Sequence, residues 1–456
     1  MRLCAVLFAA TVLTVPSTAV NDPVSIARTA FDLLMTGKYA DLRGMFTQQM
    51  LDNVSEDMLR NQLGPQLKAF GAVKKVGDAK AQTATNLSSA ALTVVVIPVD
   101  FEAGNFDFQL SLNESGKLAG LFLRPRQAAE GAEAGKTRAW SPPEYIDSTA
   151  FVERDVTIGE GEWKLPGTLS IPKGAGPFPA VVLVHGSGPQ DRDETVSANK
   201  PFRDLAGGLA SRGVVVLRYE KRTRVYGPQM ASLKNLTVQQ ETIDDAIKAV
   251  QLLRQQREVD PKRVFVLGHS LGGYLAPRIA EQEPQIAGVI ILAGSVRPME
   301  DLILEQTEYL GLTGAQLNSL KQQVAKIKQL QRGQTDGSPI LNVPPSYWLD
   351  LRGYDPALEA QKLHCQMFIL QGGRDYQVTK IDFDLWRAAL SNQKKVTFHW
   401  YPALNHLFIA GEGKSLPAEY DKPGHVAVEV IDDIATWVKP SRAVAHNVGE
   451  LSPNIA

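Results

Sequence analysis

The chain has few cysteines, almost no net charge and, after its first twenty residues, no long apolar run. Its 456 residues include only Cys4 and Cys365, so neither a disulfide framework nor a zinc site of clustered cysteines and histidines is expected. The formal net charge of −1 gives no electrostatic reason to expect nucleic acid or an anionic membrane surface as a partner. No segment after residue 20 is long and apolar enough to predict a transmembrane helix in the mature chain.

Residues 1–20 differ from the rest of the chain. Arg2 supplies a positive charge, residues 3–15 are apolar, and small residues up to Ala19 follow. This pattern predicts a cleavable secretory signal peptide and hence a periplasmic or secreted protein, with an uncleaved N-terminal anchor as the alternative. Cleavage would remove Cys4, and Cys365 is expected to be a buried structural thiol because it precedes an apolar strand.

The length favours two domains. Residues 23–125 begin with apolar residues at helical spacing and continue with strand-like segments at 90–99, 105–112 and 117–123, which predicts a small α+β domain. This domain is expected to serve packing or oligomerisation, with a share in substrate binding as the alternative; the sequence gives no oligomeric state. Residues 126–147 read as a linker rich in Ala, Gly, Glu and Pro, and residues 441–456 as a C-terminal tail.

Residues 148–440 alternate between apolar strands and helices, which predicts a mostly parallel sheet covered by helices on both faces. Between 295 and 363 the alternation stops and the pattern becomes helical. Because this insertion follows a strand, we expect it to overhang the carboxyl ends of the strands as a cap, where open α/β sheets bind ligands. A helical excursion without substrate contact is the alternative.

The most informative motif is Gly268-His269-Ser270-Leu271-Gly272, which follows an apolar strand and precedes a helix. A G-x-S-x-G sequence in this context predicts a nucleophile elbow, a sharp turn that exposes the serine hydroxyl above the sheet. Glycines flank the serine because a side chain there would collide with the tight backbone. The alternative is that Ser270 merely caps the helix.

A serine needs a histidine base that is oriented by an acid. Asp375 follows the strand at 367–370 and His406 follows the strand at 396–401, so both are expected at the carboxyl edge of the sheet. The order Ser270, Asp375, His406 is that of α/β hydrolases. The competing candidates fall within a helix or a strand or lie beside the nucleophile; they are Asp382, Asp384, His269, His399 and His425.

The tetrahedral intermediate also needs an oxyanion hole. One donor is expected to be the N–H of Leu271 and the other the N–H of Ser187, with Gly186 or Gly188 as alternatives to Ser187. Ser187 lies in the glycine-containing loop from His185 to Asp193. The charged residues of this loop, 191–193, are expected to form local ion pairs or turn caps, with substrate binding as the alternative. No metal or organic cofactor is expected to be needed.

Ser270, Asp375 and His406 together with the loop from His185 to Asp193 resemble the α/β-hydrolase superfamily. The loop is especially similar to a group of bacterial serine carboxylesterases of the dienelactone-hydrolase and prolyl-oligopeptidase type, some of which carry a small α+β domain of unknown function in front. The resemblance implies an α/β-hydrolase fold with a helical cap and a preceding α+β domain. It also implies a serine carboxylesterase acting on small esters through an acyl-enzyme, with short-chain acyl groups expected. A serine peptidase and a non-catalytic binding protein are the alternatives.

Overall fold

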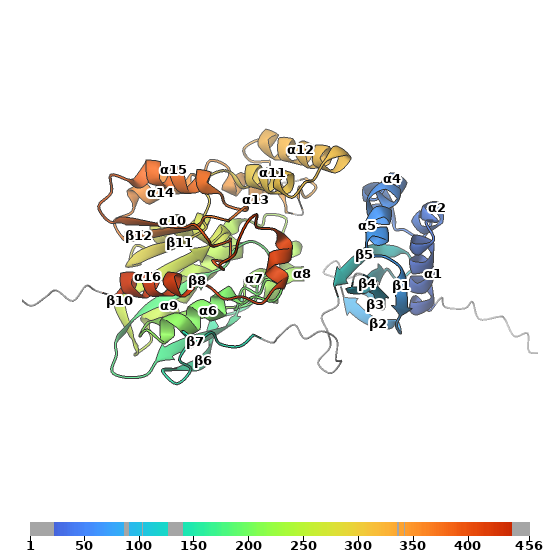
Figure 1. Cartoon of the computed structure of the whole chain (residues 1–456). Coiled ribbons are helices and arrows are strands. Elements are labelled where there is room, and N and C mark those ends of the chain that lie inside the picture. Colours follow the sequence, from blue (N-terminus) through green and yellow to red (C-terminus); the bar gives the residue numbers. More distant parts are fainter. Residues whose placement is uncertain are drawn as a thin grey trace, which may run out of the picture. The chain divides into compact units, whose positions relative to one another are not determined.

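The computed structural model describes residues 22–85, 91–102, 104–125, 140–334, 337–341 and 343–439. The predicted signal peptide, the predicted linker up to residue 139 and the predicted tail lie outside the described residues. The chain divides into two compact units, Met1–Ala134 and Gly135–Ala456. Figure 1 colours the first unit in blue to cyan and the second from green to red.

The first unit packs helices against one antiparallel sheet, in which β3 pairs with β1, β2 and β4, and β4 also pairs with β5. Its core joins the two layers, as in the edge-to-face contact of Phe31 on α1 with Phe108 on β4, whose ring centroids are 5.2 Å apart. The sequence patterns did not predict β1 and β2. The elements are α1 (Pro23–Met35), α2 (Tyr39–Arg43), α3 (Gln48–Asn53), α4 (Glu56–Met58), η1 (Leu59–Leu63), α5 (Gly64–Ala69), β1 (Val73–Val76), β2 (Lys80–Thr85), β3 (Ala91–Phe101), β4 (Gly104–Leu112) and β5 (Leu118–Pro125).

The second unit is built on an eight-stranded sheet in the order β13-β12-β11-β10-β8-β9-β7-β6. Six neighbouring strands, from β13 to β9, run parallel, whereas β7 and β6 add antiparallel pairs at one edge. This architecture confirms the predicted mostly parallel α/β fold. The strands are β6 (Phe151–Ile158), β7 (Leu165–Pro172), β8 (Phe178–Val184), β9 (Val215–Tyr219), β10 (Val259–His269), β11 (Gly288–Leu292), β12 (Gln366–Gly372) and β13 (Val396–Tyr401).

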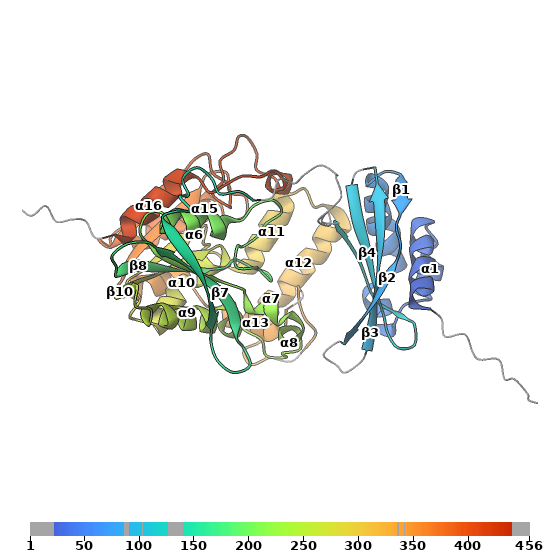
Figure 2. The ribbon, with the colours of Figure 1, turned by 90° about the horizontal axis from the view of Figure 1, so that it is seen from below.

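Helices cover both faces of this sheet (Figure 2). Successive residues of a strand point to opposite faces, so Val182 of β8 joins one buried core and Leu183 joins the other. One core contains α6 (Pro201–Ala210) and α16 (Val428–Val438), and the other contains α9 (Asp244–Arg254), α10 (Leu271–Gln282) and α15 (Lys380–Leu390). Shorter helices are α7 (Arg222–Val225), α8 (Gly227–Ala231), η2 (Gln239–Ile243) and η3 (Pro417–Asp421).

The described part of the stretch between β11 and β12 carries four helices: α11 (Met299–Tyr309), α12 (Gly314–Gln329), α13 (Pro345–Leu351) and α14 (Pro356–Lys362). We refer to residues 295–363 as the cap. Its buried side chains include Ile327 and Trp348, which belong to the same core as α9 and α10.

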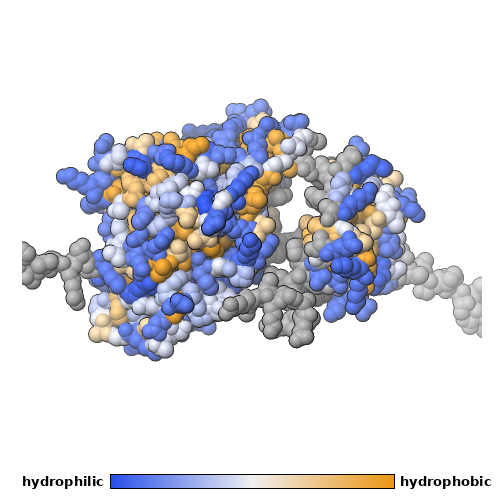
Figure 3. Space-filling model, in the orientation of Figure 1, coloured by the Kyte–Doolittle hydropathy of each residue, from blue (hydrophilic) through white to orange (hydrophobic). Residues whose placement is uncertain are grey.

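The molecular surface seen in Figure 3 consists of hydrophilic residues interspersed with smaller hydrophobic patches. None of the helices in the described part of the chain has the length and apolar character of a membrane span.

Candidate active site

Ser270 lies at the sharp turn between β10 and α10, with φ of +53° and ψ of −115°. A non-glycine residue with positive φ outside the usual left-handed region is strained, and such strain persists only where surrounding contacts enforce it. The N–H of Ser270 donates to the carbonyl of Leu292 on the neighbouring strand at 2.9 Å. A Cβ atom on Gly268 would lie 2.1 Å from the backbone oxygen of Gly272, and one on Gly272 would lie 2.2 Å from that of Val184. The two glycines are therefore required for the turn.

Asp375 and His406 come from the loops that follow β12 and β13, and they meet in the interior. Oδ2 of Asp375 lies 2.7 Å from Nδ1 of His406, and both side chains are buried. Oδ1 of the same carboxylate accepts the backbone N–H groups of Gln377 at 2.7 Å and Val378 at 3.0 Å. Gln371 donates from Nε2 to Oδ2 at 3.0 Å. The carboxylate is thus fixed from three sides and orients the imidazole of His406.

Ser270 and His406 line the same cavity, which has a volume of about 960 Å³. The predicted oxyanion donors, Ser187 and Leu271, also line it. Cap residues form much of the remaining wall, which is mainly apolar; they include Met299, Leu302, Ile303, Leu341, Val343, Tyr347 and Trp348. The cap therefore borders the space above the serine, as expected of a segment that contacts substrate.

The backbone around Gly186 distinguishes among the predicted oxyanion donors. The N–H of Gly186 donates to Oε1 of Glu194 at 2.6 Å, so it is not free to bind an oxyanion. In the described part of the chain, no backbone hydrogen bond uses the N–H of Ser187. Leu271 is the first residue of α10, where backbone N–H groups have no partner within the helix. Ser187, its alternative Gly188 and Leu271 all line the cavity with N–H groups that no described hydrogen bond uses, whereas the N–H of Gly186 is engaged by Glu194.

The sequence did not point to Glu194, which forms a buried ion pair at the wall of the cavity. Its Oε2 lies 2.9 Å from Nδ1 of His269, and Nε2 of that histidine contacts the carbonyl of His406 at 2.9 Å. Burial by itself lowers the pKa of His269, but the surrounding groups, the negative charge of Glu194 foremost among them, raise the pKa above its ordinary value. The pair links the end of the loop from His185 to Asp193 with the elbow and with the loop that carries His406. Glu194 is the residue directly after the loop from His185 to Asp193, and nothing in the surrounding sequence indicates that its carboxylate is buried at the site.

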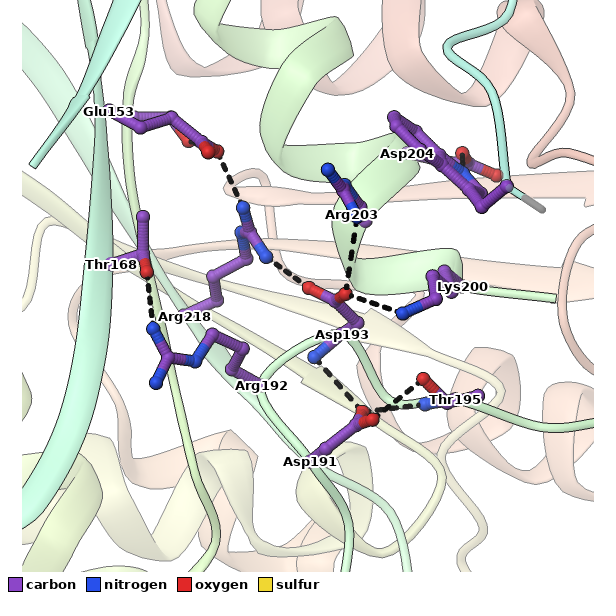
Figure 4. Close-up of polar contacts among 12 residues, drawn as sticks. Glu153, Thr168, Asp191, Arg192, Asp193, Thr195, Lys200, Arg203, Asp204 and Arg218 are labelled. Carbon is purple, nitrogen blue, oxygen red and sulfur yellow. Dashed lines mark hydrogen bonds and ion pairs between the residues drawn. The ribbon is translucent and has the colours of Figure 1, made fainter. Parts of the chain in front are cut away.

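The charged residues 191–193 form local contacts instead of facing the cavity (Figure 4). Asp191 accepts from the backbone N–H and hydroxyl of Thr195, at 2.9 and 2.7 Å, as a turn cap does. Asp193 pairs with the buried Arg218 and with Lys200. These contacts match the ion-pair and turn-cap interpretation of the loop and show how it is held in place.

His185 organises the start of the same loop. Its Nε2 lies 3.0 Å from the carbonyl oxygen of Asp191, and its ring packs against Phe202 and Tyr219. Complete burial lowers the pKa of His185 to about 4, so the ring is neutral near pH 7. A neutral, enclosed ring of this kind supports the loop structurally.

The other histidines and aspartates that could have served as base or acid are engaged in contacts of their own. His399 and His425 pair with Asp433 and Asp204, and neither histidine lines the cavity. Asp382 is fully buried but binds Arg297 and the backbone at the start of the cap. Asp384 forms an exposed pair with Lys380. Within the described ranges, no group of three or more histidine, cysteine, aspartate or glutamate side chains is arranged to hold a metal ion.

The fold together with this serine, histidine and aspartate arrangement defines the α/β-hydrolase class. Residues 203–422 match the model of the prolyl oligopeptidase family, and residues 27–121 match a family described as a protein of unknown function, DUF3887. Esterase EstD of Thermotoga maritima is 43% identical over 339 residues, which cover 74% of this chain and 77% of that protein. The chain therefore belongs to the α/β-hydrolase family that includes this esterase.

Solved structures of more distant proteins are also similar. An esterase of Pyrococcus furiosus is 17% identical, with a TM-score of 0.40 over 59% of this chain and 91% of its own. An acylaminoacyl peptidase of Pyrococcus horikoshii is 14% identical, with a TM-score of 0.40 over 74% of this chain and 52% of its own.

Proposed function

We propose that the protein is a serine carboxylesterase that hydrolyses short-chain acyl esters through an acyl-enzyme intermediate. The observation that carries the proposal is that Ser270, strained and next to the free N–H of Leu271, shares a cavity with a His406 already fixed by Asp375. The 43% identity to an esterase supports the ester as the substrate class.

In the proposed reaction, Oγ of Ser270 attacks the ester carbonyl carbon while Nε2 of His406 takes the hydroxyl proton. Asp375 stabilises the imidazolium that forms. The negative oxygen of the tetrahedral intermediate accepts hydrogen bonds from the N–H groups of Leu271 and Ser187. His406 then gives its proton to the leaving alcohol, which departs as the C–O bond breaks. Water attacks the acyl-enzyme with His406 again as base, releasing the carboxylic acid and restoring Ser270.

The short acyl group is the finer part of the proposal. The mainly apolar cavity of about 960 Å³ is large enough to hold a short acyl group together with an apolar alcohol. Nitrophenyl esters of acetate, butyrate, octanoate and laurate test this preference. Higher kcat/KM for acetate and butyrate than for octanoate is expected, and a maximum at octanoate or laurate would contradict the short-chain part alone.

Replacing Ser270 by alanine tests the nucleophile. Ser270→Ala should lower kcat for nitrophenyl butyrate by about 10,000-fold or more, because no oxygen remains to form the acyl-enzyme. The matched control is Ser232→Ala, which removes the hydroxyl of an exposed serine and should leave kcat unchanged. A fluorophosphonate should label wild-type protein at Ser270, as read by peptide mass spectrometry. Near wild-type turnover in a folded Ser270→Ala variant would show that the nucleophile is another group.

A serine peptidase is the second candidate because residues 203–422 match the prolyl oligopeptidase family. Peptidases and esterases use the same acyl-enzyme chemistry, so the two proposals differ in the leaving group. Peptide anilides and nitrophenyl esters assayed side by side distinguish them. A higher kcat/KM for a peptide anilide would replace the esterase proposal.

The proposed location is the periplasm or the extracellular medium, on the basis of the charged and apolar pattern of residues 1–20. The N-terminal sequence of the protein recovered from its native cell tests this part. A mature N-terminus shortly after Ala19 in an exported fraction is expected. An intact Met1 or Arg2 in the cytoplasmic fraction would contradict it.

A further inference from the structure

Lys221 is a buried lysine whose ammonium group binds the loop from His185 to Asp193, the loop that carries the proposed oxyanion donor Ser187. It follows β9 and is only 2% exposed, which is rare for a lysine unless it is paired. Its Nζ donates to the carbonyl oxygen of Gly186 at 2.8 Å and pairs with Oε1 of Glu241 at 2.9 Å. The catalytic steps described above do not use this ammonium group directly.

The carbonyl that Lys221 holds belongs to the same peptide group as the N–H of Ser187. A trans peptide is planar, so its C=O and N–H point in opposite directions. Fixing the carbonyl of Gly186 from one side therefore fixes the direction of the Ser187 N–H on the other. A Cβ atom on Gly186 would lie 3.2 Å from Cβ of Ser270, so this peptide is next to the nucleophile.

The preceding N–H of Gly186 is fixed as well, by Glu194 at 2.6 Å. Gly186 is thus held by a carboxylate on its N–H and by an ammonium on its carbonyl, and both partners are buried. A cation on the carbonyl also polarises the peptide and strengthens its N–H as a donor. The two contacts lie on the peptide groups before and after the Cα of Gly186, so together they restrict backbone rotation on both sides of this residue.

The contacts extend from Lys221 to the cap. Glu241 accepts the hydroxyl of Tyr347 at its Oε2, at 2.6 Å, and Tyr347 lies on the cap helix α13. Both side chains are buried and line the cavity. A continuous set of polar contacts therefore joins the cap helix, Glu241, Lys221 and the Gly186–Ser187 peptide.

We propose that Lys221 is a positioning residue that aims the N–H of Ser187 at the oxyanion, and that Glu241 and Tyr347 hold it there from the cap. The inference rests on the proposed acyl-transfer function. Lys221 acts through the peptide and does not contact the substrate. Its removal should weaken binding of the negative transition state and leave binding of the neutral ester nearly unchanged.

The main test is the double variant Lys221→Met/Glu241→Gln, which removes the charge without leaving a buried carboxylate unpaired. Losing one oxyanion donor costs roughly 100-fold to 1,000-fold in kcat, and a misaimed donor should cost less. We expect kcat for nitrophenyl butyrate to fall about 10-fold to 100-fold, with KM changed less than about threefold.

The matched control is Arg222→Met/Asp245→Asn. It removes the ion pair of the next residue, which is equally buried but does not line the cavity. Both double variants lose stability, as thermal unfolding will show, but only the Lys221 variant should lose kcat. An equal loss of kcat in both would mean that the Lys221 pair acts only through general stability, which overturns the inference.

Inhibitor binding separates positioning from packing. A trifluoromethyl ketone forms a tetrahedral oxyanion adduct with the serine, whereas the matching methyl ketone binds mainly as a neutral molecule. The Lys221 variant should lose affinity for the first in proportion to its loss of kcat and keep its affinity for the second. An unchanged affinity for the trifluoromethyl ketone, or an equal loss for both ketones, overturns the inference.

Tyr347→Phe provides a second variant if the double variant does not fold. It removes one hydroxyl and keeps the ring, so the fold should persist. We expect kcat and trifluoromethyl ketone affinity to fall together by about threefold to tenfold, because Glu241 loses its hold on Lys221. Unchanged values of kcat and of trifluoromethyl ketone affinity would contradict the proposal.

Failure of the proposed function itself would look different. In that case the wild-type protein would show neither ester turnover nor a ketone adduct.

Discussion

Asparagine at position 375 would keep the shape of the aspartate but change the hydrogen bonds at Oδ2, which accepts from Nε2 of Gln371 and lies against Nδ1 of His406. Oδ1 of Asp375 accepts two backbone N–H groups, those of Gln377 and Val378. Because an amide NH₂ facing two donors is repelled, the oxygen of the asparagine must take this side. Its NH₂ group then faces Nδ1 of His406, which is 2.7 Å from Oδ2 in the native protein. The amide will therefore donate to Nδ1 where the carboxylate accepts from it.

A histidine that accepts at Nδ1 carries its proton on Nε2. Nε2 then cannot take the proton of Ser270, and the charge that stabilises imidazolium is also gone. A loss of about 10,000-fold in kcat is expected from this wrong tautomer, which corresponds to about 5 kcal/mol in activation free energy. KM should change little, because Asp375 does not line the cavity.

The assay is the steady-state hydrolysis of nitrophenyl butyrate by Asp375→Asn beside Asp384→Asn. Asp384 is an exposed carboxylate paired with Lys380, so its variant should keep wild-type kcat and lose at most about 1 kcal/mol of stability. Thermal unfolding of both variants confirms that they are folded. A folded Asp375→Asn variant with kcat within about tenfold of wild type would refute the tautomer argument.

Two further predictions concern stability. Gly268→Ala should destabilise the protein by at least about 3 kcal/mol, since its Cβ would lie 2.1 Å from rigid backbone; Gly227→Ala, with open space around it, should cost nothing measurable by denaturant unfolding. An equal effect of the two would contradict the steric argument. Burial lowers the pKa of His185 to about 4 in the folded protein, below the ordinary histidine value of about 6.5, so the unfolded chain takes up the proton first as the pH falls. This lowers the free energy of unfolding by about 2 kcal/mol between pH 7 and pH 5. His185→Phe should remove this pH-dependent loss of stability, so the midpoint of urea unfolding should fall less steeply between pH 7 and pH 5 than in the wild type. If the midpoint of the variant falls as steeply as that of the wild type, His185 is not buried in its neutral form.

Strong hydrophobic patterns predicted the fold well. The parallel strands are nearly continuous apolar runs, because both faces of the sheet are covered, and the confirmed α/β fold follows from them. The polar strands β1 (Val73–Val76) and β2 (Lys80–Thr85) were missed. Their sequences, VKKV and KAQTAT, lack the alternation of a half-buried strand, and they form a sheet only by pairing with the long β3. Tertiary pairing stabilises them where local propensity does not.

The candidate site was predictable where its residues follow strands. Parallel strands end at one edge, so Ser270, Asp375 and His406 were expected to be neighbours there, and the structure places them at that edge. The contribution of Glu194 and Lys221 was not predictable. A buried carboxylate or ammonium looks in sequence like any surface charge, and only the packing of distant segments shows that water is excluded from it.

In residues 148–440 the sequence indicated the alternation of strands and helices, the glycines of the elbow and the groups that could react. These are local properties, set by hydrophobic period, by backbone sterics at Gly268 and Gly272 and by side-chain chemistry. The way in which the Gly186–Ser187 peptide is held depends on tertiary packing. Lys221 binds its carbonyl, Glu194 binds the preceding N–H of Gly186, and Glu241 and the cap residue Tyr347 hold Lys221 from other elements. Hydrogen-bond direction and burial depend on three-dimensional packing, which spacing along the chain does not encode.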